Sequence, residues 1–216
     1  MASLNDNILY EDRELIIVNK KAGEPTQSDL SGDKDLFSKT KKLFGEELYL
    51  VNRLDRPVSG IVVFAKSKES YNSLKQKWQE SNVVKEYFAI VEGKWSTTPV
   101  MVTQRIKKGR GSKAIIHQEG KESSLTVEAF PVFDHYSLCR IQLHTGRFHQ
   151  IRLLLSKEGY PIKGDVKYGA RRKNVDRSIY LHAYRLKLGD IEVTAPFPEE
   201  DKLWKLAGEF YIKSLS

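Results

Sequence analysis

The sequence contains one cysteine, Cys139, and therefore no pair that could form a disulfide within the chain. Cys139 lies in the alternating stretch HYSLCRIQL, which is typical of a strand, so we expect a small buried apolar side chain. No stretch approaches the ~18 to 20 apolar residues of a membrane helix. The start of the chain, MASLNDNILYEDRE, contains no apolar core of a signal peptide. These absences predict a cytoplasmic protein that makes no contact with a membrane.

Motifs for metals, nucleotides and a serine nucleophile are also missing. No second cysteine can complete a zinc site, and His144 and His149 are five residues apart across a turn that contains a glycine. The patterns GxGxxG, GxxxxGK[ST] and GxSxG do not occur. We therefore predict no metal and no cofactor.

Acidic residues are fewer than basic ones, with 28 Asp and Glu against 36 Lys and Arg and a formal net charge of +8. A basic balance favours a polyanionic partner without identifying it. Hydrophobic residues make up 40% of the 216 positions, which is ordinary for a packed core. Because no domain boundary is evident, we predict a single domain over residues 1–216 that acts as a monomer without an obligate protein partner.

The predicted elements indicate an α+β fold. Apolar residues at helical spacing predict a helix from an N-cap at Asp33 to Gly45, another after the cap Ser67, and a third in the tail from Glu199. The helices alternate with strands that include hairpins, which predicts a mixed, mostly antiparallel β-sheet flanked by helices. The basic stretch 104–113 is predicted to be a solvated loop. Strands are predicted over residues 14–20, 48–54, 61–66, 83–95, 124–133 and 136–143 and in a hairpin over 180–196.

One carboxylate lies in an unusual setting, the stretch VNRLDRPVSG. Asp55 stands between Arg53 and Arg56 at the end of a predicted strand. Pro57 disfavours a helical backbone for the residue before it, and Gly60 permits dihedral angles that other residues avoid. We expect a rigid corner that presents the side chain of Asp55 in one direction.

Two further segments place a candidate ring and a candidate cation. In the strand KEYFAIVEG, side chains alternate between faces, so Tyr87 lies on the same face as Lys85. In HTGRFHQIRLLLSKEG a strand gives way to a helix on which Arg152 borders the apolar stripe. Arg152 is therefore expected to be half-buried.

Four motifs, in order along the chain, resemble the RluA family of RNA pseudouridine synthases: NRLDRPVSG, KEYFAIVEG, LHTGRFHQIRLLLSKEGYPIKGDVKYG, and IYLHAYRL followed by APFP. The resemblance runs from ILYEDRELIIVNKKAG to VTAPFPEED, which is nearly the whole chain. It implies that Asp55 is the catalytic aspartate, that Tyr87 stacks on the target base, and that Arg152 is the basic partner of that aspartate.

The implied reaction converts specific uridines of structured RNA, ribosomal or transfer, to pseudouridine. The bond from C1′ to N1 breaks, the uracil turns, and C1′ joins C5, so the reaction is an isomerisation and needs no cofactor. An ionised carboxylate could attack C1′ or remove a sugar proton, and both routes stay open. The target must leave its stack, and Arg53, Arg147 and His149 are expected to contact RNA or line the pocket, although His149 could instead cap its own helix.

The chain departs from the family pattern at several positions. Asn52 stands where the family usually has histidine, Arg56 to Gly60 replace the usual Asp-Thr-Ser-Gly, and NKKAG replaces NKPAG. No S4 RNA-binding domain is expected, so RNA would be bound by the catalytic domain, with the basic segments Arg105–Lys113 and Lys163–Arg177 as candidates beside their default role as solvated loops. The alternative function is a catalytically inactive RNA-binding or RNA-folding factor on the same fold.

Overall fold

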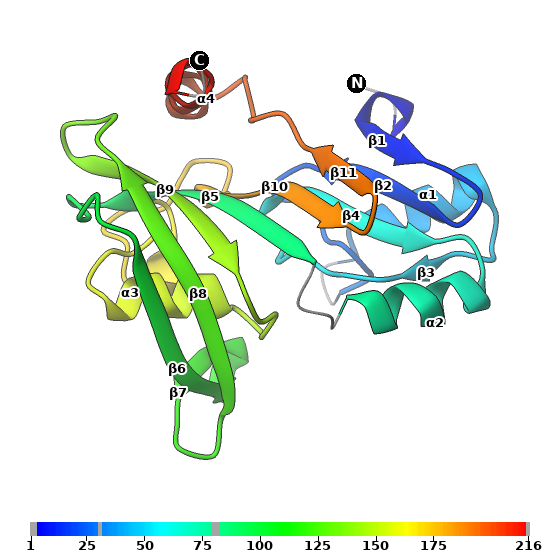
Figure 1. The fold of residues 1–216 in the computed structure, drawn as a ribbon, viewed down its shortest axis with the longest axis horizontal. Helices are drawn as coiled ribbons and strands as arrows, with labels where there is room; N and C mark the ends of the chain where they lie inside the picture. Colours follow the sequence, from blue (N-terminus) through cyan, green and yellow to red (C-terminus); the bar gives the residue numbers. More distant parts are fainter. Residues whose placement is uncertain (1–3, 30–31, 79–82, 215–216) are drawn as a thin grey trace. The chain divides into compact units, whose positions relative to one another are not determined.

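The computed structural model describes residues 4–29, 32–78 and 83–214 (Figure 1). The chain divides into two compact units. Unit 1 comprises Met1–Val84 and Ala183–Ala195, and unit 2 comprises Lys85–His182 and Pro196–Ser216. The chain therefore leaves unit 1, completes most of unit 2, returns to unit 1 for one hairpin and ends in unit 2.

The sheet of unit 1 has the strand order β1-β2-β4-β10, with β3 also paired to β4 and β11 paired to β10. Every residue of β4 is buried, as are five of the six residues of β2. Strands covered on both faces have continuous apolar sequences, such as LIIV and GIVVFA, in place of alternation. The strands are β1 (Ile8–Glu11), β2 (Leu15–Lys20), β3 (Tyr49–Leu50), β4 (Ser59–Ala65), β10 (Leu181–Leu188, in this unit from Ala183) and β11 (Ile191–Thr194).

Two α-helices belong to unit 1, α1 (Leu36–Phe44) and α2 (Lys68–Lys77), together with a short 3-10 helix, η1 (Leu4–Asn7). The N-cap of α1 is Asp35, which accepts a hydrogen bond from the backbone N–H of Ser38, so the prediction of Asp33 as the cap was wrong. Both aspartates precede the apolar run, and only the one directly before Leu36 is placed to reach that N–H group. The predicted end at Gly45 and the predicted cap of α2 at Ser67 are confirmed.

The sheet of unit 2 has the strand order β5-β9-β8-β6-β7. The predicted pair of β8 and β9 is confirmed as antiparallel, and Cys139 of β9 is fully buried, where burial raises the pKa of its thiol to about 12. The prediction of a loop over 104–113 was wrong in its first half. Residues 104–108 belong to β6, in which Arg105 and Lys108 are exposed, Lys107 is half-buried and Ile106 is buried. The strands are β5 (Val84–Glu92, in this unit from Lys85), β6 (Val100–Lys108), β7 (Ala114–Ile116), β8 (Lys121–Phe130) and β9 (Tyr136–Leu143).

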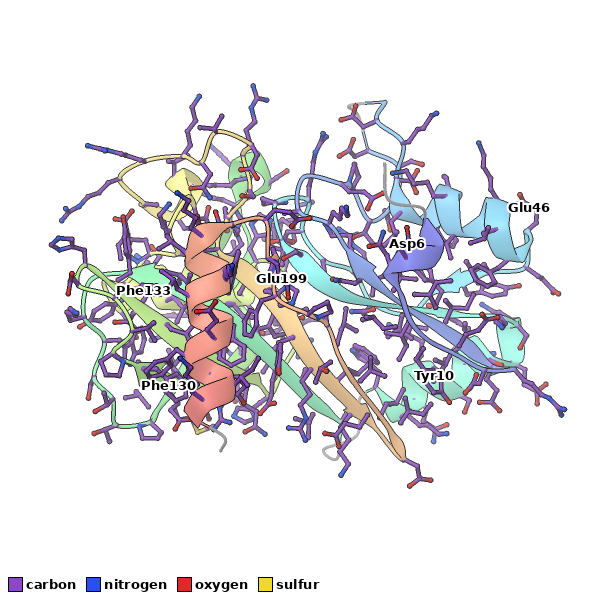
Figure 2. All side chains as sticks on the ribbon, turned by 90° about the horizontal axis from the view of Figure 1, so that it is seen from above. Asp6, Tyr10, Glu46, Phe130, Phe133 and Glu199 are labelled. Atoms are coloured by element: carbon purple, nitrogen blue, oxygen red, sulfur yellow. The ribbon has the colours of Figure 1, made fainter. Side chains whose placement is uncertain are left out.

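Unit 2 also contains the helices α3 (Gln150–Lys157) and α4 (Lys202–Ser214) and the 3-10 helices η2 (Arg110–Ser112) and η3 (Val166–Tyr168). Figure 2 shows α4 lying across the sheet with Phe130 beside it, and the ring of Phe130 is 6.1 Å from that of Tyr211. Phe88 of β5 packs against the same tyrosine at 4.7 Å. The predicted tail helix is thus confirmed, and its apolar face covers one side of the sheet.

The fold prediction is confirmed, because mostly antiparallel strands are flanked by helices. The single-domain prediction for residues 1–216 stays a prediction. No helix in the described ranges is long and apolar enough to cross a membrane. Among the same residues, no group of three or more His, Cys, Asp and Glu side chains could hold a metal ion.

Candidate active site

Asp55 lies in unit 1, in the segment that joins β3 to β4. Its backbone C=O accepts a hydrogen bond from the N–H of Val58 at 3.0 Å, which closes a turn with Arg56 and Pro57 at its centre. The side chain of Asp55 is half-buried. The rigid corner that the sequence predicts is therefore a hydrogen-bonded turn with Asp55 at its first position.

Gly60, two residues beyond the turn, has a φ of 110°. A Cβ atom on this residue would lie 2.2 Å from the backbone oxygen of Ala183 in β10. Only glycine fits such a backbone angle and such a close approach. The expected special geometry of Gly60 is confirmed, and it ties the corner of Asp55 to the neighbouring strand.

The residue before Asp55 is held by Thr26. The buried hydroxyl of Thr26 donates to the C=O of Leu54 at 2.7 Å and accepts from the N–H of Leu54 at 3.3 Å. Both backbone polar groups of Leu54 are thus bonded to a single side chain. This contact fixes the peptide plane on the N-terminal side of Asp55.

Arg56, the residue after Asp55, is held by the end of β2 and by the loop after β2, to which Thr26 also belongs. The C=O of Arg56 accepts hydrogen bonds from the N–H of Gly23 at 2.8 Å and from the amine of Lys20 at 3.2 Å. The guanidinium of Arg56 donates to the C=O of Gly23 and pairs with Asp33, with Asp29 at 3.6 Å. Arg56 therefore anchors the corner to the loop that follows β2.

Lys20, the last residue of β2, has no exposed surface. Its amine also donates to the C=O groups of Lys21 at 2.9 Å and Glu24 at 2.8 Å. The pKa of this amine is lowered to about 7, chiefly by burial and in smaller part by the charge of Arg56, whereas the carboxylates of Glu24 and Asp55 act to raise it. A positive charge in this position interacts directly with the carboxylate of Asp55.

Asn52, where the family usually has histidine, extends the pairing of β3 with β4. Its amide donates to the C=O of Ile61 at 3.2 Å and accepts from the N–H of Val63 at 2.7 Å. These bonds imitate a backbone ladder. Arg53, one residue further on, is exposed, and within the described ranges its guanidinium makes no hydrogen bond or ion pair.

Arg152 lies in unit 2, on α3, and is more buried than predicted, with 5% of its surface exposed. Its Nε and Nη2 atoms donate to the two oxygens of Asp165 at 2.7 and 2.8 Å. Its guanidinium carbon is 5.0 Å from the ring centre of Tyr168. A bidentate pair of this kind holds the guanidinium in one orientation. Its predicted role as the basic partner of Asp55 stays a prediction.

His149 and Arg147 flank the start of α3. His149 has a left-handed backbone (φ 50°), and its side chain does not cap the helix, because Nδ1 is 2.8 Å from the hydroxyl of Tyr168. The exposed side chain of Arg147 donates through Nε to the C=O of Glu122 at 3.3 Å. His149 thus occupies the N-cap position of α3, but the alternative that its side chain caps the helix is wrong.

Tyr87, in β5, is paired in register with Ile141 of β9 and is half-buried. Its neighbour Phe88 points to the face covered by α4, so Tyr87 points to the opposite face. Burial lowers the pKa of Lys85 on that same face. Tyr87 and Lys85 thus share a partly enclosed face of unit 2, as predicted from the alternation.

The site residues predicted from sequence are divided between the two units: Arg53 and Asp55 in unit 1, and Tyr87, Arg147, His149 and Arg152 in unit 2. Sequence reasoning missed Lys20 and Thr26. The available signal was the stretch NKKAGEPT, which begins in the last two residues of the buried strand β2. A lysine at the end of a strand is usually exposed, and its burial depends on contacts as distant as Arg56.

Comparison with known proteins gives one family and a set of named relatives. A sequence profile described as RNA pseudouridylate synthase matches residues 14–157, about two thirds of the chain. The enzyme named ribosomal large subunit pseudouridine synthase C from Vibrio parahaemolyticus is 30% identical, over 95% of this chain and 70% of its own length. The protein of that name from Vibrio vulnificus is 29% identical, over 93% and 68%.

Solved structures show the same fold. Human RNA pseudouridylate synthase domain containing 4 superposes with a TM-score of 0.76 at 23% identity, over 94% of this chain and 92% of that one. Human RNA pseudouridylate synthase domain containing 1 gives 0.73 at 23% identity, over 92% and 86%. At this level of identity the likeness concerns the fold.

Proposed function

This chain belongs to the RNA pseudouridylate synthase family, and we propose that it acts on ribosomal RNA of the large subunit with Asp55 as its reacting carboxylate. The match to the family over residues 14–157 supports the type of reaction, the conversion of uridine to pseudouridine. The relatives named for the large ribosomal subunit support the choice of RNA. A monomer in the cytoplasm, without an obligate protein partner or a cofactor, completes the proposal.

The chemistry requires an ionised carboxylate at a fixed position. Uridine loses the bond from C1′ to N1, uracil turns, C1′ joins C5, the hydrogen leaves C5 and N1 gains a proton, so that no atom is lost overall. A carboxylate could attack C1′ or remove a sugar proton, and Asp55 fits either route. Misplacement of a reacting group by about 1 Å can cost on the order of 100-fold in rate, so the backbone around it must be rigid.

The clamped corner is the observation that supports this role for Asp55. Thr26 holds the residue before it, while Gly23 and Lys20 hold the residue after it. An aspartate with no role beyond the surface would not need a buried threonine and a fully buried lysine to bond the backbone of its two neighbours. These contacts come from the end of β2 and the loop that follows it, and all of these residues belong to unit 1.

The remaining residues are proposed to bind RNA. Tyr87 would stack on the displaced uracil, because an aromatic ring accepts any base face while its hydroxyl keeps a hydrogen bond. Arg53 and Arg147 are exposed and suited to phosphates, and His149 would contact RNA beside Arg147. Arg152 is proposed to be a buried cation of the substrate site, fixed by Asp165.

The test uses unmodified ribosomal RNA of the large subunit, transfer RNA and the purified protein, with pseudouridine mapped in each RNA. We expect product in the ribosomal RNA. Asp55→Asn should bind this RNA as the wild type does and form no product, whereas Asp190→Asn, at the exposed turn between β10 and β11, should remain active. Product formed by Asp55→Asn would contradict its role, and product in transfer RNA alone would contradict the choice of RNA. RNA binding by the wild type without product in either RNA would favour an inactive RNA-binding factor.

A further inference from the structure

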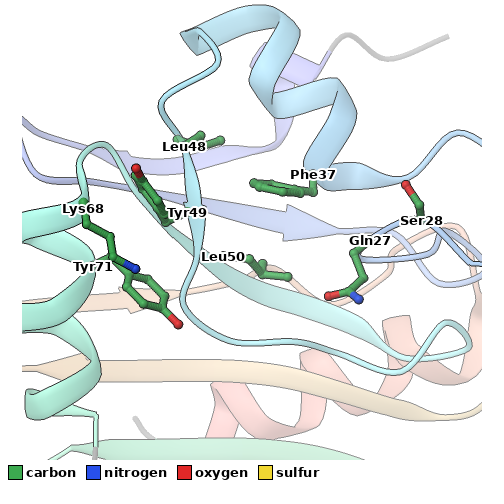
Figure 3. Close-up of a pocket in the computed structure, with 8 residues that line it drawn as sticks. All are labelled: Gln27, Ser28, Phe37, Leu48, Tyr49, Leu50, Lys68 and Tyr71. Atoms are coloured by element: carbon green, nitrogen blue, oxygen red, sulfur yellow. The ribbon is translucent and has the colours of Figure 1, made fainter.

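A hollow of about 440 Å³ opens in unit 1 beside β3 (Figure 3). Tyr49, Lys68 and Tyr71 lie on one side of it, Phe37 and Gln27 lie on the other, and Leu50 lies between them. The volume is in the range of sites that hold small molecules or single nucleotides, which begins at about 300 Å³. Its lining belongs to three parts of the chain: the loop before α1 and its first turn, β3, and the start of α2.

The first side of the hollow combines two aromatic rings with an amine. The rings of Tyr49 and Tyr71 are 5.7 Å apart and tilted by 37°, and both side chains are half-buried. The amine of Lys68 lies 4.8 Å from the ring centre of Tyr71 and 5.5 Å from that of Tyr49. Aromatic faces beside a cation are the features by which proteins hold unpaired nucleotides, with the base on the ring and the phosphate at the amine.

The charge of the lining favours an anion. Among the described residues that line the hollow, none is acidic and Lys68 alone is charged. In the described part of the chain, the exposed amine of Lys68 has no carboxylate partner. On the opposite side the amine of Lys41 lies 5.2 Å from the ring of Phe37. That amine is paired with the carboxylate of Glu46 at 3.3 Å, so Lys68 is the cation that the hollow offers to a phosphate.

The hollow is joined to the corner of Asp55 by short stretches of chain. Gln27 follows Thr26, whose hydroxyl bonds both backbone groups of Leu54, the residue before Asp55. Leu50, in the floor of the hollow, begins the stretch that leads to Leu54. All of these residues belong to unit 1, so the hollow and the corner are parts of one body.

We propose that this hollow binds one unpaired nucleotide of the substrate RNA close to the target uridine, with its base against Tyr71 and Tyr49 and its phosphate at Lys68. The inference rests on the proposed function and adds a second RNA contact to it. The exposed amide of Gln27 supplies both a donor and an acceptor to the edge of the base.

Two measurements test the proposal. The first is the affinity for a fluorescent hexauridylate, which needs no catalysis. The second is the single-turnover rate on large-subunit ribosomal RNA as a function of enzyme concentration. Tyr71→Ala should lower the affinity for hexauridylate about tenfold and raise the enzyme concentration at half-saturation by the same factor, because one base–ring contact is lost. The maximal rate should stay unchanged. Tyr71→Phe, which keeps the ring, should resemble the wild type.

Lys68→Ala should lower the slope of log affinity against log salt by about 0.7, because one phosphate contact is lost from a single strand. Lys77→Ala removes an exposed lysine at the end of the same helix and should leave the slope unchanged. If both Tyr71→Ala and Lys68→Ala had the affinity and half-saturation of the wild type, the proposal would be overturned. A protein partner would then be the alternative occupant of the hollow. Failure of the proposed function would be a separate result: the wild type would form no pseudouridine, while the affinity for hexauridylate would still test whether the hollow binds a nucleotide.

Discussion

The buried amine of Lys20 should make the stability of this protein increase with pH above neutrality. In the folded protein its pKa is lowered from 10.5 to about 7 by burial. Below pH 7 the amine is protonated in both states, and the folded state carries the cost of a buried charge. Between pH 7 and 10.5 the unfolded chain holds a proton that the folded chain has released, so the free energy of unfolding rises with pH.

The size of this effect follows from the shift. Each unit of pKa corresponds to about 1.4 kcal/mol, so the full span between folded and unfolded values is on the order of 5 kcal/mol. This is an upper bound, because the C=O groups of Lys21, Glu24 and Arg56 accept hydrogen bonds from the amine and favour its charged form. The slope should approach about 1 kcal/mol per pH unit between pH 7 and 9.

The assay is urea unfolding at pH 6 to 9 for the wild type, Lys20→Met and the control Lys21→Met at an exposed position. The buried thiol of Cys139 and the phenol of Tyr180, whose pKa values are raised by burial, act in the opposite sense above pH 9, which sets the upper limit of the window. Lys20→Met should lose the rise with pH, and Lys21→Met should keep it. An equal slope in the wild type and Lys20→Met would refute the reasoning.

Two further substitutions test the corner itself. Gly60→Ala should destabilise the protein by on the order of 3 kcal/mol or more in urea unfolding, since its Cβ would meet backbone atoms of β10, whereas Gly45→Ala has a similar φ of 101° with open space and should cost about 1 to 2 kcal/mol. Thr26→Val should lower the maximal rate of pseudouridine formation, because the backbone before Asp55 loses its hydroxyl partner. Thr40→Val removes a buried hydroxyl that bonds only within α1, and a rate loss of the same size there would count against the clamp.

The parts of the fold that could be predicted from the sequence are those in which local pattern and burial agree. The β8–β9 pair and the β10–β11 hairpin follow from alternation and from the turn at Gly189. The basic strand β6 could not be predicted, because its second half is rich in charged residues and only Val102 and Ile106 of its residues are buried. The density of charged residues therefore predicted a loop, although a weak alternation of buried and exposed positions is present.

The candidate site shows a different limit. Asp55 could be identified from its motif, but the contacts that fix it come from residues 28 and 36 positions away from their partners, and no periodicity records such distances. Arg56 is the basic residue next to Asp55 in the sequence. In the structure Arg56 turns to Asp33 and Gly23, because the loop after β2 folds back over the corner. The sequence thus predicts which carboxylate reacts, but it does not indicate the contacts that hold the backbone on either side of it.

The loop from Lys20 to Thr26 explains why a single substitution can affect two properties. Its residues hold both neighbours of Asp55, and the next residue, Gln27, borders the hollow proposed to bind a nucleotide. A change in this loop moves the corner and the rim of the hollow together, so it should lower the maximal rate and the affinity for RNA at once. Tyr71→Ala, on the far side of the hollow, should change affinity alone. If Thr26→Val and Tyr71→Ala gave the same pattern, the corner and the hollow would not be separate elements of one site.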